Sequence, residues 1–241
     1  MKNIKKVQII AGSLMIILLS MCNIDAHFGL KGSGKVVEQE RSLPIFSAIE
    51  ASGGINVYIS QGESQKVVVV TDDNIQPLVL TKVENNVLKV FLDKWSVRAS
   101  TLKILITIKD IKSVSCSGGT DAYSESPIIV SSLQINLSGG SDANFNLKAD
   151  EISGSMSGGS DLMLKGTSGT LKIEASGGSD CKAFDLITSK ADVSASGGSD
   201  IFITVNEELI ASASGGSDIK YKGNAKIIKS ESSGGSDIIK E

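Results

Sequence analysis

The stretch that decides the fold is Ser138-Gly139-Gly140-Ser141-Asp142, which reads S-G-G-S-D and is one of seven such stretches in the chain. A single copy would be an ordinary glycine-rich turn, because glycine adopts positive φ easily and Ser and Asp hydrogen-bond nearby backbone. The copies, the first with Thr at its fourth position, end at Asp121, Asp142, Asp161, Asp180, Asp200, Asp218 and Asp237. The intervals between these aspartates are 21, 19, 19, 20, 18 and 19 residues. The chain therefore repeats one structural unit of about 19 residues.

This period is too short for repeats built from helix pairs and matches one coil of a parallel β-helix or a similar β-solenoid. Apolar and polar residues alternate on both sides of the motif, as in half-buried strands: Ile135 and Leu137 precede it, and Ala143 and Phe145 follow. Each coil should contain a strand, the S-G-G-S-D corner, a second strand and a looser return. We therefore predict an all-β, right-handed parallel β-helix over residues 111–241, with the handedness taken from the general twist preference.

The segment before the repeats, residues 43–110, contains strand-like runs without the motif and predicts an irregular β-region. Asn85-Asn86 is expected to form the tight turn of a hairpin. The stretch S-G-G-I-N, Ser52 to Asn56, suggests that this region shares the later coil geometry. At the other end, polar residues occupy inward positions and predict a polar cap: they are Ser230, Ser232 and Lys240.

The N-terminus predicts export. Residues 1–22 combine a basic start with an apolar run, Val7 to Met21, which is too short for a comfortable membrane span. L-S-M-C, ending at Cys22, resembles a bacterial lipobox, in which Cys22 would carry lipid and anchor the protein to a membrane. Cleavage after Ala26 would instead give a soluble product, and a retained anchor is the third alternative. The expected location is the outer membrane or cell surface as a lipoprotein, or else the periplasm or medium.

The charge argues against a nucleic-acid partner. The formal net charge is −3, and removing residues 1–21 removes Lys2, Lys5 and Lys6 but no acid, so that −3 − 3 = −6 remains. Phosphate binding requires a basic face.

Several stretches together resemble a known family. They are G-S-G-K-V from Gly32, L-P-I-F-S-A-I from Leu43, S-G-G-I-N-V-Y-I-S-Q-G from Ser52 to Gly62, and the later S-G-G-S-D repeats. This order resembles the auto-transporter adhesin head GIN domain family of Bacteroidetes, whose name matches Gly54-Ile55-Asn56. The resemblance covers residues 32–241 and implies an exported, all-β, β-helix-like protein. It implies no catalytic residues and no cofactor.

The residues themselves offer little for catalysis. His27, the sole histidine, lies beside a possible cleavage site, so nucleophilic systems that need a histidine base have none in the folded part. Cys116 and Cys181 fall in different inward columns three coils apart, too far for a disulfide, and are expected to be buried. Residues 111–241 contain no Arg, which polysaccharide lyases on β-helices would use beside acidic groups. We therefore expect no enzymatic activity.

The row of aspartates is the unusual electrostatic feature. Carboxylates at the ~4.8 Å strand spacing repel one another by about 1 kcal/mol per neighbour in a water-like dielectric, and a cation would relieve that repulsion. Calcium is therefore a possible ligand of Asp121, Asp142, Asp161, Asp180, Asp200, Asp218 and Asp237. A structural role, in which each Asp accepts hydrogen bonds at its corner, is preferred.

The sequence thus leaves three functional hypotheses. The first is an exported, adhesin-like or envelope binding protein that presents repeated β-helix faces to an extracellular or envelope ligand, either a glycan or a protein. The second is a structural envelope protein without a discrete ligand. The third is a solenoid stabilised by calcium.

Overall fold

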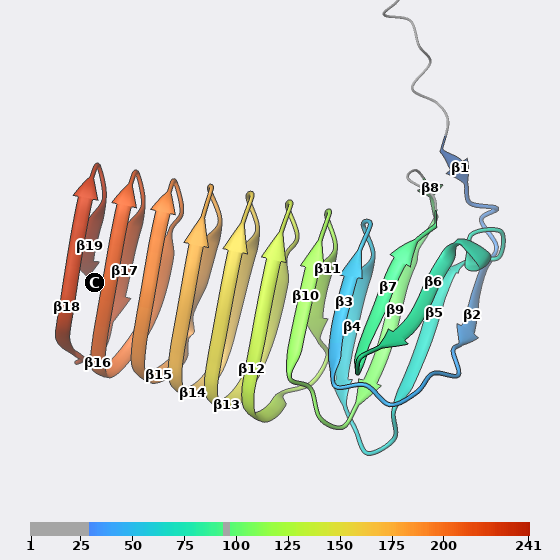
Figure 1. The fold of residues 1–241 in the computed structure, drawn as a ribbon, viewed down its shortest axis with the longest axis horizontal. Helices are drawn as coiled ribbons and strands as arrows, with labels where there is room; N and C mark the ends of the chain where they lie inside the picture. The colour runs from blue at the N-terminus through green and yellow to red at the C-terminus, as the bar shows by residue number, and fades with distance from the viewer. Residues whose placement is uncertain (1–28, 94–96) are drawn as a thin grey trace, which may run out of the picture.

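The computed structural model describes residues 29–93 and 97–241, which form an elongated stack of β-coils (Figure 1). The predicted signal segment lies outside the described residues, and so do Cys22, Ala26 and His27. Within the described part, no helix has the length and apolarity needed to cross a membrane.

The repeats form the predicted β-solenoid. In Figure 1 the chain rises along the near strands, turns at the upper corners and descends behind them as it advances, which makes the coil right-handed. Neighbouring coils pair in parallel, so that Leu137 lies opposite Met156 and Met156 opposite Ala175. The strands are β10 (Ser113–Ser117), β11 (Asp121–Ser124), β12 (Ile128–Ser138), β13 (Ala143–Ser157), β14 (Asp161–Ser176), β15 (Asp180–Gly197), β16 (Ile201–Gly215), β17 (Asp218–Lys222), β18 (Lys226–Gly234) and β19 (Asp237–Lys240).

The return between corners differs from the expected loose loop. From β13 to β16 one continuous strand runs from each corner to the next, so the return is itself hydrogen-bonded to its neighbours. Differences in coil length appear as register shifts within this part, for example between Met163 and Lys165 and between Ala183 and Ile187. Such bulges insert residues into one strand without disturbing the pairing on either side. The corners therefore stay aligned although the coils differ in length.

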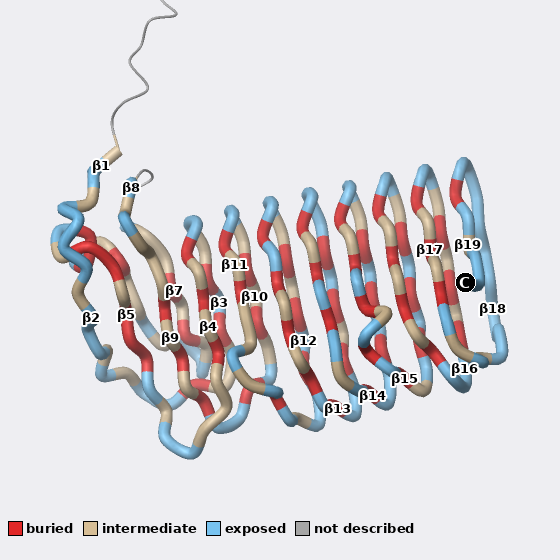
Figure 2. Tube along the Cα trace, turned by 180° about the vertical axis from the view of Figure 1, so that it is seen from behind, coloured by how far each residue is buried: buried red, intermediate tan, exposed pale blue. Residues whose placement is uncertain are grey.

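The core is a column of apolar side chains inside the coils, visible as buried segments along both sides of the stack (Figure 2). Leu137, Ile173 and Ile201 are 2%, 0% and 0% exposed, which confirms the inward columns predicted from the alternation. Burying one such side chain stabilises the folded state by about 1.5–3 kcal/mol relative to leaving it exposed, so these columns provide most of the driving force for stacking.

The S-G-G-I-N stretch forms the first corner of the solenoid, as predicted. It joins β3 (Ala48–Ser52) to β4 (Asn56–Gln61), and these strands pair in parallel with β10 and β11. Asn56 therefore stands opposite Asp121, at the head of the aspartate row.

Antiparallel strands close the N-terminal end of the stack. The predicted hairpin is confirmed: Asn85 and Asn86 adopt φ of 50° and 68°, the left-handed conformation that a tight turn requires. Strand β7 of this hairpin continues one side of the solenoid beside β3, and β9 continues the other side beside β4. The elements of this region are β1 (Leu30–Lys31), β2 (Val36–Glu40), β5 (Lys66–Asp72), η1 (Gln76–Leu78), β6 (Val79–Glu84), β7 (Val87–Leu92), β8 (Val97–Arg98) and β9 (Leu102–Ile108).

The last coil has the exposed polar residues that were expected, but it also exposes Ile227, Ile228 and Ile239, so this end of the stack is only partly polar. Ser230 and Ser232 lie opposite the buried Ala211 and Ala213, in inward columns, yet every residue of β18 is exposed. Lys240 follows the same rule, opposite the buried Tyr221.

Candidate functional site: the corner ladders and the two faces

The two glycines of the Gly139-Gly140 corner have different structural roles. Gly139 has φ of 65°, and a Cβ there would lie 3.3 Å from the backbone nitrogen of Gly118 in the preceding coil. Gly140 has φ of 73°, but a Cβ there would meet no atom within 4 Å. At this corner the first glycine thus supports both the turn and the close stacking of corners, whereas the second supports only the turn. In the last three corners only the first glycine has positive φ, at Gly197, Gly215 and Gly234.

The Ser or Thr at the fourth position of the motif forms a buried ladder between coils. The Ser179 side chain is fully buried, and its Oγ accepts a hydrogen bond from the Ser160 N–H at 3.2 Å while donating to the Ser176 carbonyl at 3.0 Å. The hydroxyl therefore closes its own corner and also joins the preceding coil. The N–H groups that make the equivalent bond belong to Ile55, Thr120, Ser141, Ser179 and Ser199.

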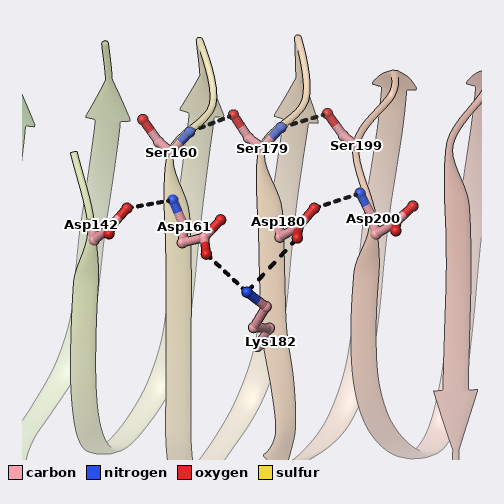
Figure 3. Close-up of polar contacts among 8 residues, drawn as sticks. All are labelled: Asp142, Ser160, Asp161, Ser179, Asp180, Lys182, Ser199 and Asp200. Atoms are coloured by element: carbon pink, nitrogen blue, oxygen red, sulfur yellow. Dashed lines mark hydrogen bonds and ion pairs between the residues drawn. The ribbon is translucent and has the colours of Figure 1, made fainter. Parts of the chain in front are cut away.

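The aspartates form a second ladder, which runs in the opposite sense. The Asp161 N–H donates to Oδ1 of Asp142 at 3.0 Å, so this carboxylate accepts from the following coil (Figure 3). The same bond joins Asp121 to Asp142, Asp180 to Asp200, Asp200 to Asp218, and Asp218 to Asp237. The carboxylates are therefore backbone acceptors, but they bond the next coil rather than their own corner.

The aspartate ladder has one interruption. The Asp180 N–H donates to the Ser160 carbonyl at 3.1 Å instead of to the Asp161 carboxylate. There the Lys182 ammonium lies 2.8 Å from Asp161 and 3.8 Å from Asp180, as Figure 3 shows. The hydrogen bond with Asp161 raises the pKa of Lys182. Sequence reasoning missed this lysine. The available signal was its position two residues after the motif, in a column that holds only one other lysine, Lys220.

The structure brings the seven predicted aspartates into a single row at one edge, where neighbours contribute one carboxylate each. Among residues 29–93 and 97–241, no three His, Cys, Asp or Glu side chains come together as a metal-binding group. Within the described residues, the calcium hypothesis therefore rests on the row of single carboxylates and not on a cluster of ligands around one point.

The outward surfaces on the two sides of the corner differ in chemistry. The Asp face, formed by the outward residues after each aspartate, holds aromatic and basic side chains. Tyr58 stacks on Tyr123 with ring centroids 5.2 Å apart. Phe184 meets Phe202 edge to face at 5.5 Å, and Lys222 lies 4.0 Å from the Phe184 centroid. The Ser face, formed by the outward residues before each motif, consists mainly of small polar and charged side chains: Ser115, Asn136, Ser155, Glu174, Ser194 and Ser212.

Two of the hollows in the described surface lie near these faces. One, of about 720 Å³, lies at the bends of the first coils and is lined by Lys112, Ile129, Ser132, Lys148 and Asp150 among others. The other, of about 820 Å³, lies beside the first corner, at Gly53 and Gly54.

Cys116 and Cys181, the cysteines of the described residues, are buried, unpaired thiols, as predicted. Burial raises the pKa of both Cys116 and Cys181 to about 12, with a smaller contribution from the nearby aspartates. Because the thiolate is the nucleophilic form, neither residue is reactive near neutral pH.

The fold has close relatives among solved structures. A protein from Bacteroides fragilis, described as a "putative adhesin", is 27% identical with a TM-score of 0.82, over 88% of this chain and 99% of that one. A "putative lipid binding protein" from Parabacteroides distasonis is 22% identical with a TM-score of 0.71, over 87% and 99% of the two chains. A "putative adhesin" from Parabacteroides merdae is 21% identical with a TM-score of 0.67, over 88% and 99%. Among curated proteins, none matches this sequence.

The sequence itself gives the family. Residues 45–225 match the profile described as "Putative auto-transporter adhesin, head GIN domain". The matched region contains the Gly54-Ile55-Asn56 corner and six of the seven S-G-G-[ST]-D corners. Since the match spans most of the chain, this protein belongs to the head GIN domain family.

Proposed function

We propose that the protein is an exported, non-enzymatic, adhesin-like binding protein that presents the faces of its solenoid to a glycan or protein of the envelope or surroundings. The Asp face carries this proposal, because it gathers half-buried Tyr58, Tyr123, Phe184 and Phe202 with lysines on a stacked scaffold. Aromatic side chains with an apolar body and accessible edges are common in recognition surfaces. The adhesin description of the family supports the same proposal.

A binding role without catalysis agrees with how the polar groups are used. The motif hydroxyls and carboxylates are engaged in the two ladders, and the thiols are buried with raised pKa values. These groups serve the stacking of coils, so they are poorly placed to act as nucleophiles or general bases.

Export would follow from the N-terminal signal, with lipid on Cys22 or cleavage after Ala26. Labelling cells with a palmitate analogue should mark the wild-type protein and leave Cys22→Ala unmarked. An unlabelled mature protein that begins at His27 would instead favour soluble secretion.

The binding proposal is tested with purified protein and intact cells. Surface proteolysis of intact cells should degrade the protein, and immobilised protein should retain material from glycan, matrix or envelope fractions. The double variant Tyr123→Ser/Phe202→Ser should lose this binding, whereas Asn136→Ser on the Ser face should keep it. If neither face retains any ligand while loss of the protein weakens the envelope, a structural role replaces the binding role.

A further inference from the structure

The hollow beside the first corner exists because the stack of corners begins there. Strand β7 follows β3 in parallel only through Val90, which lies opposite Ala51. The chain then turns away, and the Asp93 N–H donates to the Leu78 carbonyl at 2.9 Å. Among the described residues no glycine corner stacks on the N-terminal side of Gly53; Leu92 lies there instead, and a Cβ on Gly53 would be 3.7 Å from its side chain. The later corners, in contrast, stack glycine on glycine.

The walls of this hollow combine an aromatic ring with charged groups. Its volume is about 820 Å³, and its floor includes the backbone of Gly53, Gly54 and Gly118. Phe91 and Leu92 form its apolar wall. The polar wall consists of Glu50, Lys82 and Lys89.

The charged groups balance one another. Lys82 lies 2.8 Å from Glu84, while Lys89 lies 3.4 Å from Glu84 and 3.8 Å from Glu50. The lining thus holds two ammonium groups and one carboxylate, Glu50. Glu84, outside the lining, is paired with both lysines, so the four groups together carry no net charge that would favour an anion or a cation. The pairs are half exposed, so their groups can exchange partners with a ligand at little cost.

The Lys82 side chain covers the Phe91 ring of the apolar wall. The Lys82 ammonium lies 5.6 Å from the centre of the Phe91 ring, in a cation–π contact that is weak at an exposed site. Displacing this lysine would expose the ring beside donors and acceptors. A ligand that fits must therefore offer an apolar patch of ring size and a rim of uncharged hydroxyl groups.

We propose that this hollow binds a neutral sugar unit of a glycan. The C–H face of the sugar packs on Phe91, and its hydroxyls take hydrogen bonds from Lys89 and give them to Glu50. Backbone groups of the Gly53–Gly54 corner lie at the floor, where a side chain would obstruct approach. The inference rests on the proposed function and deepens it, because it specifies the ligand class and places one site at the N-terminal end of the Ser face.

The test measures binding of full-length mature protein to an array that carries neutral glycans together with sialylated and uronate-containing ones. The neutral glycan that binds is then titrated by calorimetry against Phe91→Ala and Lys89→Gln. Each substitution should weaken binding by about tenfold or more, as expected for a central contact. Lys172→Gln and Ser194→Ala, at exposed positions on later coils that do not line the hollow, should bind as the wild type does. Unchanged thermal melts show that the variants are folded.

Three results would overturn the inference: no glycan bound at all, binding of acidic glycans only, or binding that survives both Phe91→Ala and Lys89→Gln. Retention of a protein ligand through the Asp face, without any glycan, would overturn this inference and leave the proposed function intact. The proposed function fails separately if no fraction of matrix, glycan or envelope is retained.

Discussion

Lys182 stands where the aspartate ladder is interrupted: its ammonium lies 2.8 Å from Asp161, the carboxylate that does not accept the N–H of the following aspartate. Asp180 completes the bridge at 3.8 Å. A fixed positive charge thus occupies the position between two stacked carboxylates where a bound cation would otherwise reduce their repulsion.

Replacing Lys182 by Met should destabilise the protein only slightly, by about 0.5 kcal/mol, because the pair is 44–45% exposed and screened by solvent. The loss should shrink in high salt. Urea unfolding at low and high salt measures this. A double-mutant cycle with Asp161→Asn shows whether the effect comes from the pair, and a zero coupling energy would contradict it.

Ser179→Ala should cost more than any change in the aspartate row, about 1–3 kcal/mol. The substitution leaves the buried Ser160 N–H without its acceptor and the Ser176 carbonyl without its donor. Ser194→Ala, which removes an exposed hydroxyl from the Ser face, serves as the control and should cost less than 0.5 kcal/mol. Equal losses in the two variants would argue against a stabilising buried ladder.

The two glycines of a corner should respond differently to Ala. Gly140→Ala introduces only the left-handed strain, about 1–2 kcal/mol. Gly139→Ala adds a contact of 3.3 Å with the Gly118 backbone and should destabilise the protein further. Thermal melts of the two variants measure this difference. A higher melting temperature for Gly139→Ala than for Gly140→Ala would show that the corners stack more loosely than described.

The calcium hypothesis is tested at Asp180, whose Oδ1 accepts the Asp200 N–H at 3.4 Å. If the row acts as a backbone acceptor, Asp180→Asn keeps an acceptor and should cost under about 1 kcal/mol. Calcium and chelator should then leave the melting temperature of both proteins unchanged. A calcium-dependent rise of several degrees in the wild type, absent in the variant, would establish calcium binding instead.

The raised pKa values of Cys116 and Cys181 predict that the reactivity of these thiols depends on pH and on folding. With folded-state pKa values of about 12, Cys116 and Cys181 should resist iodoacetamide at pH 8 and react only after unfolding. Because the thiols ionise more easily in the unfolded chain, their contribution to stability is full below the unfolded pKa of about 8.5 and decreases as pH rises toward 12. Mass spectrometry of native and urea-treated protein measures the labelling of each cysteine, and rapid labelling of Cys116 or Cys181 in the native protein would contradict their burial.

The repeat period and the alternation of apolar and polar residues were enough to predict the coils. A tight corner requires glycine and a half-buried strand requires apolar residues at every second position, so both can be recognised from the local sequence. The first corner at Ser52–Asn56 was predictable for the same reason. The ladders were predicted only in part, since Ser179 and Asp142 bond atoms of neighbouring coils, and sequence separation does not reveal which coil an acceptor serves. Lys182 and the Phe91 hollow depend on where one register is interrupted and where the stack begins, and these are properties of the assembled coils alone.

The bulges between corners have a further consequence for how such a protein can vary. Coils of 18 to 21 residues share one straight edge, since the register shifts absorb their differences elsewhere. The corners therefore keep a constant spacing along the stack, while insertions and deletions are accommodated on the side of the coil away from them. Residues inserted there would change the surface that this side presents without moving any corner, and duplicating one whole coil would lengthen the solenoid by one strand spacing.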